Sequence, residues 1–292
     1  MFGRFDGAMY LLSQIFTALG IVYIYKLARL FMDEYKAVLA AMLQFGIIYY
    51  DFSSVEFNVN VISLALWPMC TYYFLQAYRQ NRLKDWLLFG LFGGINLLNK
   101  YTGVLLLGAI GVFLLTGVKG WKQFINYKAY AAALCVVAVL TPHIWWLAEH
   151  NFEMLNYILM RNTSTKIMDS EWRHLLYPLK FAGAQILFAG AALLCYAVFY
   201  KFSEKENKPA CNDENGRFLL ICGFLPMMVF MTISMAAGTP LKSMWGFPCQ
   251  FLIGIMLVYF WPIKVNESKT LRYSAVMAGW SLLFAIAYGV QC

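Results

Sequence analysis

The sequence predicts an all-helical membrane protein, and three observations support that prediction. Of its 292 residues, 61% are hydrophobic and only 13% are charged, whereas a soluble domain of this length has about 25% charged residues. Apolar segments of the length that crosses a bilayer, roughly 20 residues each, recur along the whole chain. These segments are continuous, whereas the strands of a membrane β-barrel alternate in polarity. We therefore expect a polytopic helical fold.

We expect about ten spans, in chain order, and their boundaries follow the apolar runs. The fourth and fifth are short, so they are expected to be tilted or to cross only in part. The expected spans are 8–30, 36–50, 58–78, 85–98, 102–117, 129–147, 177–200, 216–235, 245–262 and 272–290.

The basic residues predict how these spans are oriented. Alternation of ten spans places seven of the 23 basic residues on one side, namely Arg4, Lys100, Arg161, Lys166, Arg173, Lys180 and Lys242, and the others on the opposite side. Cytoplasmic loops are rich in Lys and Arg, so the richer side is expected to be cytoplasmic. The net charge of +8 lies in short clusters between spans, which indicates orientation rather than binding of nucleic acid.

The chain is expected to form a single transmembrane domain over residues 1–292. It has an external loop at 148–176 and a cytoplasmic loop at 201–216. An even number of spans leaves the N-terminus outside, yet MFGRFD (Met1 to Asp6) contains no signal peptide. We therefore expect that an N-terminal span is missing and that the domain is truncated. A translocated short N-terminal tail is the alternative.

The cysteines predict neither a metal centre nor a disulfide framework. All seven are scattered, mostly within expected spans, and no CxxC pair occurs. They are interpreted as buried structural thiols. No cofactor is therefore expected, although a divalent cation held by carboxylates stays open.

One polar stretch interrupts the apolar pattern at the expected external face. The segment YYDFSSVEFNVNV, from Tyr49 to Val61, contains two carboxylates, Asp51 and Glu56. Lys100, His143 and Lys242 are expected at the same depth, near Trp145 and Trp245. Cations there can hold a phosphate, a carboxylate can act as general base, and aromatic rings can stack on a sugar or an isoprenoid.

Each of these residues also has a structural interpretation. Lys100 could extend to lipid headgroups, and the tryptophans match an interfacial aromatic belt. His143 could be a residue that satisfies a helix end, and Asn58 and Asn60 could cap the following span. Three glycines, Gly90, Gly93 and Gly94, are expected to allow close packing of helices rather than to bind phosphate.

The order of the motifs resembles a known family. YYDFSSVEFNVNV is followed by RQNRLKDWLLFGL (Arg79 to Leu91) and by NKYT (Asn99 to Thr102). LTPHIWWLAEHNF (Leu140 to Phe152) and PLKSMWGFP (Pro240 to Pro248) come later in the chain. Together they resemble bacterial glycosyltransferase family 39 of the GT-C superfamily, which includes the dolichyl-phosphate-mannose–protein mannosyltransferases and the lipid A aminoarabinose transferases. The resemblance extends over about residues 7–262.

This resemblance implies a GT-C fold and an inverting transfer of a sugar from a polyprenyl-phosphate-linked donor. The acceptor would be a lipid, a glycan or a protein, at the external face of the bacterial inner membrane. The family's best-known catalytic Asp lies in the first external loop, which is expected upstream of Met1, so Glu56 is the catalytic candidate within the chain. The substrate-binding candidates are Asp51, Asn58, Asn60, Lys100, Tyr101, His143, Trp145, Arg161, Lys242 and Trp245.

Two other classes of function stay open from the sequence. A polytopic transporter or lipid flippase would also be apolar and helical, but its polar residues tend to lie near the bilayer midplane, whereas these gather at one face. A non-catalytic fragment is the other alternative, because the first-loop Asp is absent from the chain.

Overall fold

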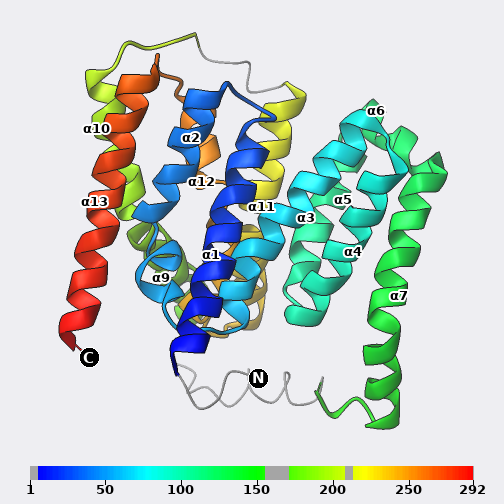
Figure 1. The fold of residues 1–292 in the computed structure, drawn as a ribbon. Helices are drawn as coiled ribbons and strands as arrows, with labels where there is room; N and C mark the ends of the chain where they lie inside the picture. The colour runs from blue at the N-terminus through cyan, green and yellow to red at the C-terminus, as the bar shows by residue number, and fades with distance from the viewer. Residues whose placement is uncertain (1–5, 155–170, 208–212, 292) are drawn as a thin grey trace.

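The structure, a computed structural model, describes residues 6–154, 171–207 and 213–291 (Figure 1). Within these ranges the chain is helical, and β-pairing is limited to one isolated bridge between Lys205 and Ile263. The α-helices are α1 (Asp6–Ala28), α2 (Glu34–Met42), α3 (Val59–Gln80), α4 (Leu83–Asn99), α5 (Gly103–Leu115), α6 (Val118–Trp121), α7 (Tyr127–Glu149), α9 (Arg173–Phe188), α10 (Gly190–Phe202), α11 (Glu214–Ala237), α12 (Ile253–Phe260) and α13 (Glu267–Gln291). The 3-10 helices are η1 (Leu43–Gly46), η2 (Ile48–Tyr50), η3 (Phe52–Ser54), η4 (Lys122–Ile125) and η5 (Ser243–Gln250). The all-helical prediction is confirmed for the described residues.

Fewer helices than the ten expected spans are long and apolar enough to cross a membrane. Among the described residues, α1, α7 and α11 are each long and apolar enough to cross a membrane. Four bent pairs raise the number to seven if each pair is one span: α2–η1 with η2–η3, α5 with α6–η4, α9 with α10, and η5 with α12. The expected spans at 58–78, 85–98 and 272–290 coincide with α3, α4 and α13, which are not among these seven. About ten spans therefore stays a prediction.

The connections between helices alternate between two ends of the bundle, as the sequence predicts. The segments 29–33, 81–82, 116–126 and 261–266 lie at the upper end in Figure 1. The segments 43–58, 100–102 and 238–250 lie at the other end, which we call the lower end, together with both ends of the described chain. Asp51, Glu56, Lys100 and Lys242 therefore lie in connections at the lower end, and His143 lies in the lower part of α7.

Small residues bring the helices close together, as predicted for α4. A Cβ atom at Gly90 would collide with the backbone oxygen of Ala132 in α7, and one at Gly94 would come within 2.8 Å of Val139. At Gly93, by contrast, a Cβ would make only ordinary contacts. Gly254 plays the same part between α12 and α2, where a Cβ would collide with the backbone oxygen of Ala40. The close approach of α4 to α7 fixes the distance between Lys100 and His143, which lie near the lower ends of these helices.

Candidate functional site

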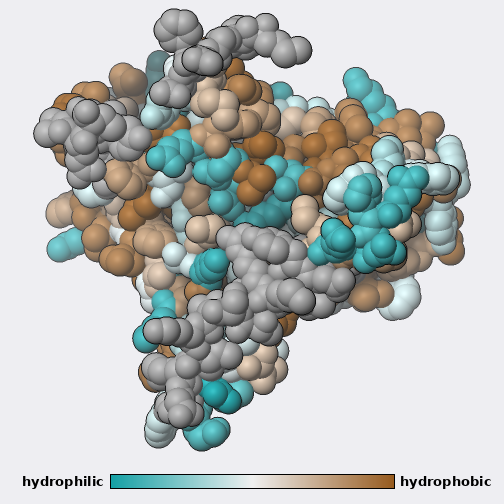
Figure 2. Space-filling view, turned by 90° about the horizontal axis from the view of Figure 1, so that it is seen from below, coloured by the Kyte–Doolittle hydropathy of each residue, from teal (hydrophilic) through white to brown (hydrophobic). Residues whose placement is uncertain are grey.

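Polar side chains gather at the lower end of the bundle. Figure 2 views this end from below and shows hydrophilic residues in a hollow near its middle, with hydrophobic surface on both sides. A recess in which a few polar groups converge within apolar surroundings is typical of a binding site.

Lys100 occupies the break between α4 and α5. Its backbone N–H closes the last turn of α4 on the oxygen of Asn96 at 3.0 Å, and extended backbone at Lys100 then ends the helix. The Nζ atom donates a hydrogen bond of 2.7 Å to Oδ1 of Asn60 in the first turn of α3. The side chain therefore points into the protein, and the interpretation in which it extends to lipid headgroups is not the one the structure adopts.

Burial changes the acidity of this ammonium group. Desolvation favours the neutral amine and lowers the pKa of Lys100 to about 8. The Cys249 thiol, near the C-terminal end of η5, is close enough to the Lys100 ammonium to interact with it electrostatically. Lys100 is thus still mostly protonated at neutral pH, with few competing partners, which suits it to bind an anion.

Asn58 and Asn99 shape the segment beside Lys100. The side-chain oxygen of Asn58 accepts a hydrogen bond from the Asn60 N–H at 2.9 Å and caps α3, which confirms the capping interpretation for Asn58. Asn99 donates to the Val59 oxygen at 2.8 Å and to Ser63 Oγ at 2.9 Å. These bonds hold the lower ends of α3 and α4 together and free the Asn60 side chain to meet Lys100.

The next residue, Tyr101, reaches a different helix. Its hydroxyl lies 2.6 Å from Nε2 of His143 near the end of α7. The His143 ring is parallel to that of Trp146, with ring centres 6.1 Å apart, and Trp146 stacks in turn on His150 at 4.3 Å. The connection 100–102 therefore contacts α3 through Lys100 and α7 through Tyr101. The structure pairs Asn60 with Lys100 and Tyr101 with His143, and the two pairs are joined through the connection 100–102.

Two further polar residues, Asn96 in the last turn of α4 and Thr102 in the connection itself, were missed by sequence reasoning. Neither side-chain atom of Asn96 nor the hydroxyl of Thr102 has a hydrogen-bond partner, although all three atoms are buried. Buried polar groups are nearly always paired in folded proteins. Asn96 and Thr102 are therefore exceptions, and the Asn96 side chain, which is 0% exposed, packs against Gly103 inside the turn between α4 and α5. A single Asn within an apolar helix gives no sequence signal that distinguishes it from a packing residue.

The second predicted cation, Lys242, begins the 3-10 segment η5. Its side chain is exposed, and its backbone oxygen accepts from the Trp245 N–H at 2.9 Å. Trp245 is half-buried against Phe230, with ring centres 5.7 Å apart. Lys242 lies seven residues before Cys249, or roughly 14 Å at the rise of a 3-10 helix. Lys242 therefore lies at the start of η5 and Lys100 near its end, so the two lysines are not beside each other.

A buried amide network holds η5 in place. Gln185 of α9 donates to the Ser243 oxygen at 2.9 Å, and the Tyr49 hydroxyl donates to the same oxygen at 2.5 Å. Gln250 donates to the side-chain oxygen of Gln185 at 2.9 Å. The rings of Tyr49 and Phe247 lie 4.2 Å apart. Irregular backbone at membrane depth needs such internal partners, so this network positions the segment that carries Lys242.

Asp51 belongs to another part of the lower end. It lies between the 3-10 turns η2 and η3, and its Oδ1 accepts a hydrogen bond of 3.0 Å from Ser281 of α13, while Oδ2 is buried without a partner. Ser13 and Gln14 of α1 donate to the Ser54 oxygen and anchor the same turns. The contacts of Asp51 are thus with α13 and not with Lys100.

The remaining candidates are more exposed. Glu56 has an exposed side chain, and Trp145 is 68% exposed, with its indole N–H donating to Glu149 at 2.6 Å. Arg161 lies outside the described residues. In the part of the chain that the structure describes, no cluster of three His, Cys, Asp or Glu residues could hold a metal ion.

Comparison with known proteins identifies the family. A model of the family described as dolichyl-phosphate-mannose-protein mannosyltransferase matches residues 1–146 of the 292. The chain belongs to this family. This mannosyltransferase match extends from α1 through the His143 turn of α7, so it includes Asn60, Lys100 and Tyr101 but not η5. No curated protein and no solved structure matches the chain. The family and the apolar helices together indicate a multi-pass membrane protein of the glycosyltransferase type.

Proposed function

We propose that the chain belongs to a membrane glycosyltransferase that moves a sugar from a polyprenyl-phosphate-linked donor to a lipid, glycan or protein acceptor. The family supports the reaction class. The single observation that carries the site is the Lys100 connection, which joins the ends of α3 and α7 through Asn60 and His143. We further propose that about ten helical segments cross a bacterial plasma membrane in a GT-C-like arrangement, with the lower end external.

In this proposal the Lys100 ammonium contacts the donor phosphate directly. The bond between the sugar C1 and the phosphate oxygen breaks, and the phosphate leaves with the electron pair. A nearby cation stabilises the charge that develops on this leaving group. The Tyr101–His143 pair lies on one side of the phosphate.

Lys242 has a different role in the proposal. Because it is exposed and lies at the other end of η5, it attracts the anionic donor and binds it less closely than Lys100. Trp245, beside it, offers a ring face to the isoprenoid or the sugar. The acceptor oxygen or nitrogen forms the new bond to C1 from the opposite face and loses its proton to a carboxylate. Glu56 is the candidate for that proton acceptor, and Asp51 orders the turns around it.

Alanine variants of the two lysines test this function. Lys100→Ala is expected to lower binding of a fluorescent polyprenyl phosphate, and sugar transfer from the corresponding donor, at least tenfold, since a charge-assisted hydrogen bond contributes about 1.5–3 kcal/mol. Lys242→Ala is expected to have a smaller effect that disappears at high salt. Lys180→Ala, which removes an exposed lysine of α9, serves as the matched control. Unchanged binding and transfer in Lys100→Ala would contradict the proposal.

A further inference from the structure

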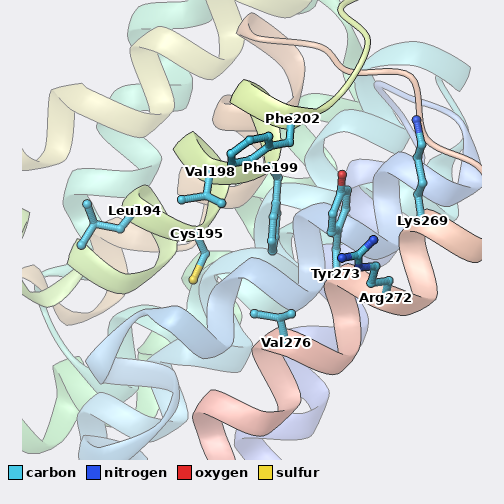
Figure 3. Close-up of a pocket in the computed structure, with 9 residues that line it drawn as sticks. All are labelled: Leu194, Cys195, Val198, Phe199, Phe202, Lys269, Arg272, Tyr273 and Val276. Carbon is cyan, nitrogen blue, oxygen red and sulfur yellow. The ribbon is translucent and has the colours of Figure 1, made fainter.

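A second cavity lies far from this site, between α10 and α13 in the upper half of the bundle (Figure 3). Its volume is about 490 Å³, within the range of about 300–1,000 Å³ that is usual for ligand pockets. The sides are formed by Leu194, Val198 and Phe202 of α10 and by Lys269, Arg272 and Val276 of α13. From Lys269 to Val276 the helix rises by roughly 10 Å, so the cavity is a groove that runs inward from the upper end.

The floor of the groove is rigid and preformed. Phe199 and Tyr273 stack with ring centres 4.0 Å apart and an angle of 14° between their planes. The Tyr273 hydroxyl lies 2.6 Å from Ser203 Oγ, which fixes the ring at the end of α10. A ligand that enters the groove therefore meets two ordered aromatic faces and need not reorganise them.

The two ends of the groove differ in chemistry. Figure 3 shows Lys269 extending past the Tyr273 hydroxyl toward the upper end, and the Arg272 guanidinium lower down, beside the base of the Tyr273 ring. Arg272 takes part in no ion pair among the described residues. The acidic residue near Lys269 is Glu204, whose carboxylate already pairs with Lys264 at 3.1 Å. The inner end is lined by Leu194, Cys195 and Val276, so it is apolar apart from one thiol.

The groove opens to the outside of the bundle. Leu194 is 70% exposed and Phe202 is 76% exposed, so no described part of the chain covers them. In a multi-pass membrane protein, such surfaces of peripheral helices face lipid. The ligand that matches a cationic outer end, an apolar inner end and a lipid-facing opening has a phosphate head and an acyl tail.

We propose that this groove binds an anionic phospholipid of the membrane, with its phosphate against Lys269 and Arg272 and one acyl chain over Phe199 and Tyr273. A zwitterionic lipid fits the apolar part but lacks net charge for the two cations. A free phosphate would satisfy the cations but leave the apolar floor exposed. The anionic leaflet of a cytoplasmic membrane surface favours basic residues in this position, which agrees with the upper end facing the cytoplasm.

Native mass spectrometry of the purified full chain tests the proposal with two lipids of identical acyl chains, phosphatidylglycerol and phosphatidylcholine. The wild type is expected to retain phosphatidylglycerol more tightly. The double variant Lys269→Gln/Arg272→Gln is expected to lose that preference, by about fivefold for each removed cation. The matched control, Lys84→Gln/Lys122→Gln, removes the same charge from exposed positions at the upper end of other helices and is expected to behave as the wild type.

A second variant tests the apolar part with the charges intact. Val276→Trp, at a position that is 48% exposed, fills the groove and is expected to weaken retention of both lipids. Leu283→Trp, on the same helix and 63% exposed outside the groove, is the control for the added indole. The proposal is overturned if Lys269→Gln/Arg272→Gln keeps the preference for phosphatidylglycerol, if Lys84→Gln/Lys122→Gln loses it to the same extent, or if Val276→Trp retains both lipids as well as the wild type does.

Discussion

Lys100 and Asn60 lie 40 residues apart in sequence, yet their side chains share a hydrogen bond of 2.7 Å at the lower ends of α4 and α3. The bond orients a half-buried ammonium toward the interior of the polar end. It leaves Nζ with two further N–H donors, since an ammonium group has three. The site that we propose for the donor phosphate is built on this pair.

The pH dependence of donor binding should report Lys100. Burial lowers the pKa of its ammonium to about 8, so the charged form is present below that pH and is lost above it. Affinity for a polyprenyl phosphate should therefore fall as the pH rises through about 8, with the phosphate fully ionised throughout because its second pKa is about 6. Titration of binding between pH 7 and 10 measures this. Lys100→Arg should bind without the alkaline decrease, because a guanidinium stays protonated, and Lys180→Arg should retain it.

Asn60 should control the pH at which the affinity for the polyprenyl phosphate decreases. Asn60→Leu removes the acceptor from a half-buried cation, so the pKa of Lys100 should fall further and binding should weaken already near neutral pH. Asn60→Asp places a carboxylate beside the ammonium, which stabilises the charged form and should raise the pKa. The same pH titration distinguishes the two. Shifts in one direction for both variants, or no shift for either, would show that the pair does not set the charge of Lys100.

Gln185 should be important for stability although it touches no substrate in our proposal. Gln185→Leu removes three hydrogen bonds of the network, those that join the Gln185 side chain to Ser243, Tyr49 and Gln250, and each contributes about 0.5–1.5 kcal/mol. We expect the free energy of unfolding to fall by about 2–4 kcal/mol, measured by denaturant unfolding in detergent. Gln123→Leu, at the upper end, loses one weak bond of 3.4 Å and one of 2.8 Å from Asn126, which keeps a second acceptor in Asn81, and should change stability less. Equal stability of the two variants would contradict the importance of the network.

The contact between α4 and α7 gives a prediction with an internal control. Gly90→Ala places a methyl group against the backbone oxygen of Ala132, which cannot retreat without moving α7. We expect a loss of about 1–3 kcal/mol in the free energy of unfolding. At Gly93 the nearest atoms lie 3.6 Å from the added methyl, so Gly93→Ala should be neutral or stabilising by up to about 1 kcal/mol. Thermal unfolding of both variants in one detergent measures the difference. A Gly93→Ala variant less stable than Gly90→Ala would contradict the close contact between α4 and α7.

The sequence was sufficient to predict the helices and the polar end because both follow from local composition. Long apolar runs require helices in a membrane, and alternation of their connections brings Lys100, His143 and Lys242 to one end. The cap at Asn58 is likewise local, since the residue precedes an apolar run. The partners of these residues were harder to predict, because they depend on packing between distant helices.

Three residues, Gln185, Gln250 and Asp51, show why side-chain partners could not be predicted from the sequence. Gln185 and Gln250 each appear as a single polar residue in an apolar run, and only the fold reveals that they meet across 65 residues. Asp51 has the composition of a substrate ligand, but the turns around it direct its carboxylate to Ser281, 230 residues later. Side-chain direction in irregular turns depends on backbone angles that composition does not specify.

Photocrosslinking tests the central claim most directly. A polyprenyl phosphate with a photoreactive group next to its phosphate is bound to the purified chain, activated and mapped by peptide mass spectrometry. We expect the label on the connection 100–102 and on η5, and we expect its loss in Lys100→Ala but not in Lys180→Ala. Labelling of the groove between α10 and α13 instead, with the lower end unlabelled, would contradict the placement of the donor at Lys100.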